Sequence, residues 1–497
     1  MHVRTIVIVF IAVAILAVLA IVLIPQLYKP KQVSPKTYWP TQGWQTSTPE
    51  EQGLDSVKLA EMLQAIQKQN TQIDSLLVIR NGSVLLDAYF YNPYDGTFPH
   101  DLASVTKSFM TTLIGIAADQ GKIQLDQPVV SFFPDRTIAN LDARKEHVTV
   151  RHLAGMVNGF ESGCMGGDEA TLDRMRSSSD WVQSALDRKM VQEPGISFCY
   201  DSPGMHLLSA ILQESTGMTA LEFARQNLLE PLGIREVIWE SDPQGYNHGW
   251  GDLHLKPRDA AKLGYLWLNN GVWEGKQIVS AAWVEDAVKP HSETGQDDYG
   301  YGWWVSQDSY YAMGRGGQAI KVVPAWNAIV VTTGSGFEYD EISPNLIAAV
   351  IDSTKPLPAN PVGVAQLDAA LTALVQPPSS LPDGALPDTA KVISGKTYVF
   401  VPNSANVDTL SLEFNNSSEV TIYMKRMGSD VIWPIGLDGK YRLSSEGLEL
   451  RGYWENPQTL VIEIFDNGLS TLRFQFEADR LLVESPGMRL EGHVKNP

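Results

Sequence analysis

Strand-like segments lie near both ends of the first three quarters of this chain, and helical patterns lie between them. Residues 73–80 and 83–89 are rich in apolar and β-branched residues, and Asn81-Gly82 between them is a strong hairpin signal. Residues 319–333 return to strand-like composition, whereas residues 180–232 mostly follow helical spacing. One sheet built from both ends of a domain, with a helical insertion between, accounts for this order. We therefore predict an α/β domain.

The last hundred residues have a different character. Short alternating segments, such as 397–401, 420–424 and 459–464, recur about every ten residues and are separated by turn residues. This pattern predicts a small all-β domain at 393–497, either a barrel or a sandwich. The Pro-rich and Ser-rich stretch at 376–392 is typical of a linker.

The amino terminus carries a long apolar run. Residues 5–24 hold no charged residue, and as a helix they would cross a bilayer core of about 30 Å. The run is longer than the roughly 7–15 residues of a cleaved signal peptide, so we expect an uncleaved transmembrane anchor at 1–27. The aperiodic segment 28–49 is then a tether to a larger domain at 50–375.

The overall charge argues against one class of partner. The formal net charge is -19, and a surface of this sign would repel the phosphates of nucleic acids. No zinc-type Cys/His spacing occurs, and we expect neither a metal nor an organic cofactor. Two cysteines, Cys164 and Cys199, are too few to build a disulfide scaffold. They pair if the domain is exported, or each is a small buried apolar residue.

A single Ser-x-x-Lys, formed by Ser104 and Lys107, opens a helical run that ends at Gly121. The i, i+3 spacing puts the hydroxyl and the amine on one face of a helix, where they can meet. A serine is a weak nucleophile until another group takes its proton, and a neutral lysine can do this. By itself the tetrad is weak evidence, because a chain of this length holds one or two by chance.

Several segments together resemble the serine β-lactamase-like hydrolases. This penicillin-recognising fold is shared by class C β-lactamases, DD-peptidases, EstB-type esterases and 6-aminohexanoate-dimer hydrolases. It implies an antiparallel sheet flanked by helices with a helical subdomain, so the fold expected for the whole chain is α/β (α+β) with added anchor and all-β domain. The resemblance covers residues from about 50 to about 355 and is carried by six segments: 102–108, 121–129, 148–159, 194–202, 255–264 and 314–318.

The resemblance implies roles for individual residues. Ser104 would be the nucleophile, and Lys107 and Tyr200 would share the proton transfers, although a lone tyrosine is more often only a packed aromatic. In the third motif, the N–H of Gln318 would complete an oxyanion hole with that of Ser104, and Gly317 would let the backbone approach the substrate.

Two positions depart from the family pattern. Ser202 replaces the usual asparagine of the second motif, and Arg315-Gly316 replaces the usual Lys/His-Thr/Ser. These changes put β-lactamase and carboxypeptidase activity in doubt, while Gly316-Gly317-Gln318 resembles the esterase and aminohexanoate-dimer hydrolase branch. Arg315 either holds a substrate carboxylate or is a surface charge. His152 and His206 lie in no triad motif, so we interpret them as structural.

We therefore expect a membrane-anchored serine hydrolase that cleaves esters or amides of small molecules, short peptides or oligoamides through an acyl-enzyme. A DD-peptidase, penicillin-binding protein or β-lactamase is the alternative within the family. A non-catalytic anchored binding or sensor module is the alternative of another class. We expect specificity to reside in the loops 159–180 and 243–252.

The lysines after the anchor would favour a cytoplasmic location for the domains beyond it, but long domains often translocate regardless of charge. The resemblance favours a single-pass protein of the cell membrane with its catalytic domain outside the cytoplasm. The oligomeric state stays open.

Overall fold

The computed structural model describes residues 38–495, except 70, 91–93, 95, 163–169, 296, 375–385, 404, 427, 466–468 and 486–487. The anchor predicted at 1–27 lies outside these residues, as does most of the tether. Over the described ranges, no helix is both long enough and apolar enough to span a bilayer. The last residues of the predicted tether are part of the folded domain, because they include η1 (Pro40–Gln42) and β1 (Gln45–Thr46). Strand β1 pairs with β3 (Ser83–Tyr89).

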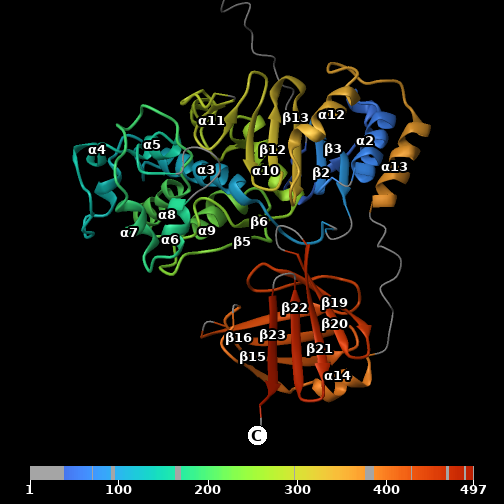
Figure 1. Cartoon of the computed structure of the whole chain (residues 1–497). Coiled ribbons are helices and arrows are strands. Elements are labelled where there is room, and N and C mark those ends of the chain that lie inside the picture. Colours follow the sequence, from blue (N-terminus) through green and yellow to red (C-terminus); the bar gives the residue numbers. More distant parts are fainter. Residues whose placement is uncertain are drawn as a thin grey trace, which may run out of the picture. The chain divides into compact units, whose positions relative to one another are not determined.

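An eight-stranded sheet forms the centre of the larger domain (Figure 1), and all its neighbouring strands are antiparallel except β1 and β3. The prediction that both ends of the domain build the sheet is confirmed, because β2 (Ile73–Arg80) pairs with β13 (Ala328–Gly334). The strand order is β1, β3 (Ser83–Tyr89), β2 (Ile73–Arg80), β13 (Ala328–Gly334), β12 (Gln318–Val323), β11 (Tyr310–Gly314), β10 (Trp304–Val305) and β9 (Asp298–Tyr299).

The β2–β3 hairpin follows the expected turn chemistry. Asn81 and Gly82 both have positive φ, 51° and 83°, as the favoured two-residue hairpin turn requires. Every residue of β2 is buried, because both faces of this central strand are covered. On one face lie α2 (Ser56–Gln69), α12 (Ser343–Ala349) and α13 (Pro361–Leu374), which Figure 1 shows side by side although they come from opposite ends of the domain.

The other face of the sheet is covered by α10 (Pro257–Leu268), which contacts β12 and β13. This helix lies so close to the sheet that a Cβ at Gly264 would be 2.9 Å from the side chain of Ile320 and 3.0 Å from that of Ile329. A glycine is therefore required where the helix and sheet meet.

The helical insertion surrounds α3 (Thr106–Asp119), whose residues Thr106–Ala117 are all buried. The predicted helix from Ser104 thus begins with a 3-10 turn, η3 (Ala103–Val105). Around it lie η4 (Val129–Phe132), α4 (Ala143–Glu146), α5 (Val150–Ala154), α6 (Ala170–Arg176), α7 (Trp181–Leu186), α8 (Ser202–Thr216), α9 (Ala220–Ala224) and the π-helical η5 (Arg225–Leu229).

The remaining elements of this domain are short. A three-stranded sheet has the order β4 (His100–Asp101), β6 (Leu253–Leu255) and β5 (Ile238–Trp239), and it adjoins the start of η3. The others are η2 (Glu50–Gln52), the hairpin of β7 (Val272–Trp273) and β8 (Lys276–Gln277), α11 (Ala281–Ala287), η6 (Pro324–Trp326) and η7 (Tyr339–Glu341).

The carboxy-terminal domain is a β-barrel. A pairing of β17 with β19, at Gly436 and Arg451, closes nine of the described strands into a ring, which decides between the predicted barrel and sandwich. After α14 (Asp388–Ile393), the strands are β14 (Thr397–Phe400), β15 (Val407–Asn416), β16 (Glu419–Arg426), β17 (Ser429–Gly436), β18 (Arg442–Leu443), β19 (Glu449–Asn456), β20 (Thr459–Phe465), β21 (Leu469–Glu477), β22 (Arg480–Ser485) and β23 (Met488–Val494).

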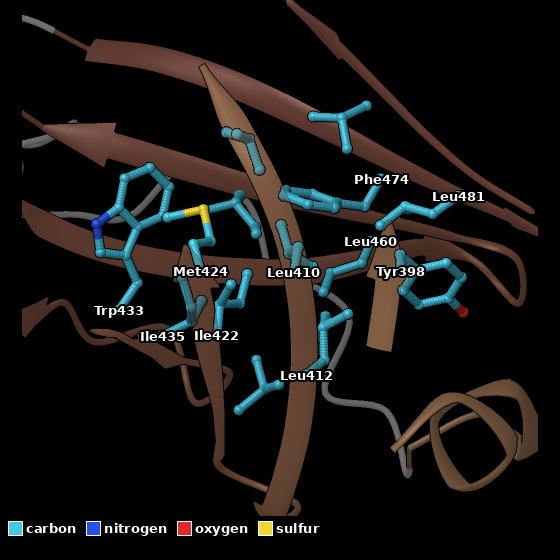
Figure 2. Packing of buried hydrophobic residues seen from close by; sticks show 14 of the residues in the cluster. Tyr398, Leu410, Leu412, Ile422, Met424, Trp433, Ile435, Leu460, Phe474 and Leu481 are labelled. Atoms are coloured by element: carbon cyan, nitrogen blue, oxygen red, sulfur yellow. The ribbon is translucent and has the colours of Figure 1, made fainter. Parts of the chain in front are cut away.

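Apolar side chains from strands all around the ring fill the barrel (Figure 2). Trp433 is among them and packs beside Met424, so it belongs to the core and not to a ligand platform. Arg451 and Glu463, opposite each other on β19 and β20, form an ion pair whose side chains are 1% and 10% exposed.

Candidate active site

The loop before Ser104 has a strained backbone. Ala103 has φ 44°, a left-handed conformation that costs about 1–3 kcal/mol for a residue with a Cβ. Its N–H donates to the Asp101 carboxylate at 2.8 Å, and its carbonyl accepts from the Thr106 hydroxyl at 2.6 Å. These two hydrogen bonds hold the strained residue in place immediately before Ser104.

Ser104 and Lys107 meet as their spacing predicts. Lys107 Nζ lies 2.8 Å from Ser104 Oγ and also donates to the carbonyl oxygen of Trp250 at 2.9 Å. The lysine is only 1% exposed. A buried amine held by a main-chain carbonyl is thus fixed beside the serine hydroxyl.

Tyr200 also lies close to this lysine. Lys107 Nζ is 4.7 Å from the centroid of the Tyr200 ring, which stacks on Trp304 at a centroid distance of 6.3 Å. Its carbonyl accepts from the Ser162 hydroxyl at 3.0 Å. The structure therefore brings the three predicted polar residues of the site together.

The residue before Tyr200 is Cys199, which is buried and disulfide-bonded. For Cys199, the paired alternative therefore holds. Cys164 itself lies outside the described residues.

A cavity of about 800 Å³ opens beside Ser104 and Tyr200. Both loops predicted to carry specificity contribute to it, through Leu172 and Arg176 in one and through Trp250 to Asp252 in the other. Glu293 and Thr294 also line it. The rest of the lining combines apolar and aromatic side chains, Phe198, Trp304, Met313 and Phe337, with the charged side chains of Asp101, Arg315 and Glu338.

The predicted third motif forms one wall of this cavity through Gly314 to Gly317. A Cβ at Gly314 would lie 2.9 Å from the Ser104 nitrogen, so only a glycine lets this strand end approach the nucleophile. Gly317 has φ 97°, and a Cβ there would lie 2.2 Å from the Phe337 ring. Arg315 is exposed at the cavity wall and has no ion-pair partner within the described part of the chain, and both of its alternative roles stay predictions.

Two predicted site residues lie behind the cavity wall. Gln318 is 1% exposed, and its side chain bonds to the N–H and carbonyl of Gly334, at 2.7 and 2.8 Å, and to the carbonyl of Arg315, at 2.8 Å. It ties the turn to β13, while the role of its own N–H stays a prediction. Ser202 is fully buried as the first residue of α8.

The histidines have structural partners. His152 Nδ1 accepts from the Thr149 N–H in the capping box of α5. His206 lies 3.1 Å from Asp242, but burial outweighs this partner and lowers the pKa of the imidazole. Among the described residues, one group could hold a cation, namely Glu240, His248 and Asp252, where His248 already bonds to Asp252 at 2.6 Å.

Sequence reasoning missed Trp250 and Trp304. Trp250 contributes through its main-chain carbonyl, which no side-chain pattern can reveal. Trp304 lies on a two-residue strand, too short for a periodic signal.

Comparisons with known proteins identify the family. The family model described as Beta-lactamase matches residues 59–352. The 6-aminohexanoate-dimer hydrolase of Paenarthrobacter ureafaciens is 24% identical over 314 residues, which are 58% of this chain and 80% of that hydrolase.

Two solved structures share the fold. A putative 6-aminohexanoate-dimer hydrolase from Bacillus anthracis has a TM-score of 0.53 at 20% identity, over 65% of this chain and 90% of that one. EstCE1, a hydrolase with promiscuous acyltransferase activity, has a TM-score of 0.50 at 17% identity, over 60% of this chain and 99% of that one. The expected resemblance is confirmed: the chain belongs to the beta-lactamase family of serine hydrolases.

Proposed function

We propose that this protein cleaves ester or amide bonds through an acyl-enzyme formed on Ser104. The observation that carries the proposal is the 2.8 Å contact of Lys107 Nζ with Ser104 Oγ at the wall of an open cavity. A hydroxyl in reach of a buried amine and open to a substrate is the arrangement that nucleophilic catalysis needs.

In the acylation step, Lys107 acts as the base and accepts the proton of Ser104 as Oγ attacks the carbonyl carbon. The oxyanion forms beside the Ser104 N–H, next to the glycine turn. For the second donor we propose an N–H of residues 315–318, which include the predicted Gln318. Lys107 and Tyr200 then pass a proton to the departing alcohol or amine.

In the deacylation step, the same two residues take a proton from water as it attacks the acyl carbon. The proton returns to Ser104 Oγ when the C–O bond breaks, and the acid leaves the cavity. The placement of Tyr200 against the Lys107 amine supports this shared role.

We propose a substrate of the esterase or oligoamide class. Ser202 is buried behind the wall, where the family pattern expects a substrate-binding asparagine, and the aromatic lining suits an apolar acyl chain. Relatives named as 6-aminohexanoate-dimer hydrolases and as a hydrolase with acyltransferase activity support the same class. Cleavage of β-lactams or cell-wall peptides is the alternative.

We also propose that the apolar run at 5–24 anchors the enzyme, with the hydrolase domain outside the cytoplasm. The disulfide at Cys199 supports this side of the membrane, because disulfides persist in oxidising compartments. Thiol titration of the denatured, unreduced protein tests this point and should find no free thiol.

The test of the proposed function uses the full chain in detergent micelles. Wild type and Ser104→Ala are treated with a fluorophosphonate probe, weighed by intact mass spectrometry, and assayed on p-nitrophenyl butyrate, a linear aminohexanoate dimer and nitrocefin. We expect one adduct that the variant lacks, with turnover of the ester or the dimer. A folded wild type with no adduct and no turnover would instead favour the binding module. Turnover of nitrocefin, with no turnover of the other two substrates, would favour the β-lactamase alternative.

A further inference from the structure

A buried ion pair lies directly behind Tyr200. Asp201, the next residue, receives two hydrogen bonds from the Arg188 guanidinium, at 2.5 and 3.1 Å. The two side chains are 1% and 3% exposed. Neither residue lines the cavity, and neither contacts Ser104 or Lys107 among the described residues.

The Asp201 carboxylate is fully occupied by donors. Besides Arg188, it accepts from Asn158 at 2.8 Å and from the Ser162 hydroxyl at 3.4 Å. A Cβ at Gly204 would lie 2.4 Å from one of its oxygens, so the α8 backbone is packed against the carboxylate as well. The carboxylate thus has one position.

The Arg188 guanidinium is held equally firmly. It donates to the carbonyls of Ala185, at 3.0 Å, and Glu161, at 3.2 Å, and lies 4.7 Å from the Phe160 ring centroid. The pair therefore connects the segment carrying Tyr200 to residues 158–162 and to the end of α7.

Helix capping does not explain this arrangement. Asp201 is the N-cap of α8, yet its side chain makes no cap hydrogen bond and turns to Arg188 instead. Burying two charges is costly and gives little net stability compared with apolar packing. What the pair does fix is the backbone next to Tyr200, whose carbonyl is bonded to the same Ser162 that contacts Asp201.

We propose that Arg188 and Asp201 are positioning residues that hold the Tyr200 ring over the Lys107 amine. This inference rests on the proposed function, since it assigns the pair to the proton transfers of Tyr200. A displacement of about 1 Å in a catalytic group can lower turnover by about a hundredfold. The pair would then act on kcat more than on KM.

The test is a double-mutant cycle between the ion pair and Tyr200, with kcat and KM measured on the best substrate. Asp201→Asn and Arg188→Met should each lower kcat about 10- to 100-fold with Tyr200 present. In a Tyr200→Phe background each should lower kcat less than about threefold, because the ring that the pair positions no longer transfers protons. Arg188→Lys keeps the charge without the two-pronged geometry and should recover part of the loss.

A matched control is a second buried arginine–carboxylate ion pair, Arg451–Glu463 in the barrel. Glu463→Gln should lower the unfolding temperature and leave kcat in place. Circular dichroism and thermal unfolding identify the variants that fold, and only these are compared. If Arg188→Met does not fold, Arg188→Lys replaces it in the cycle.

Equal losses in both Tyr200 backgrounds would overturn the inference and leave the pair a structural role. That outcome differs from failure of the proposed function, in which Ser104→Ala would keep turnover or Tyr200→Phe would have no effect.

Discussion

Lys107 Nζ donates a hydrogen bond of 2.9 Å to the carbonyl oxygen of Trp250 while it lies 2.8 Å from Ser104 Oγ. The amine of a flexible side chain is thus held at one point by main chain from a loop 143 residues away. The position of the proposed base depends on that loop as much as on its own helix.

The first prediction concerns the identity of the base. Lys107→Arg places a guanidinium beside Ser104 and should lower kcat about 10²- to 10⁴-fold, because a guanidinium does not lose its proton and cannot accept one from Ser104. Steady-state turnover and the rate of fluorophosphonate labelling measure this loss.

Lys145 provides the control for this variant. It is also fully buried, donates to the carbonyls of Ala139 and Leu186, and has its pKa lowered to about 8 by burial. Lys145→Arg should lower the unfolding temperature and keep kcat. An active Lys107→Arg enzyme would remove Lys107 from the proposed mechanism.

The second prediction concerns the loop that presents the Trp250 carbonyl. A Cβ at Gly249 would lie 2.0 Å from the carbonyl oxygen of Met205 in α8, so Gly249→Ala must displace the loop. We expect kcat to fall at least about tenfold, since the carbonyl no longer holds Lys107. At Gly251 a Cβ meets nothing nearer than 3.8 Å. Gly251 lines the cavity, so Gly251→Ala can raise KM, but it should keep kcat within about threefold. Equal losses of kcat in the two variants would contradict the steric argument.

The third prediction concerns pH. Burial alone would lower the pKa of His100, but the Asp74 carboxylate at 3.1 Å and the Asp101 carbonyl at 2.7 Å outweigh it and raise the pKa. A raised folded-state pKa gives stability that is complete below the unfolded value of about 6.5 and is lost as pH rises through the folded value.

His100→Gln should therefore cost more unfolding free energy at pH 6 than at pH 9, as measured by urea denaturation. His493→Gln is the control, because that side chain is 67% exposed on β23. A cost for His100→Gln that grows with pH would mean that the imidazole is held neutral.

Local patterns predicted much of this structure. The two strands of the β2–β3 hairpin have the expected bounds, because strand patterns and turn chemistry act over neighbouring residues. The Ser104–Lys107 contact was also predictable, since one helical turn brings it about.

What the sequence did not predict depends on distant chain. Closure of the barrel depends on the pairing of Gly436 with Arg451, and neither residue type predicts that pairing. The same holds for the Arg188–Asp201 pair, because an aspartate at the start of a helix is most simply interpreted as a cap.

The last prediction concerns the wall of the proposed oxyanion hole. A Cβ at Gly314 would lie 2.7 Å from the Leu102 carbonyl and 2.9 Å from the Ser104 nitrogen. Gly314→Ala must therefore move the end of β11 away from the nucleophile and disturb the donors to the oxyanion. Loss of one such donor lowers kcat about 10²- to 10³-fold, which is the loss we expect.

Gly275→Ala is the control for substitution of a glycine, because a Cβ there meets nothing within 4 Å although its φ of 77° is left-handed. This variant should lose stability and keep kcat. In Gly314→Ala the ground-state contact of Lys107 with Ser104 persists, so KM should change much less than kcat. A variant with normal kcat would place the oxyanion away from this strand end and move the search for its donors to the other walls of the cavity.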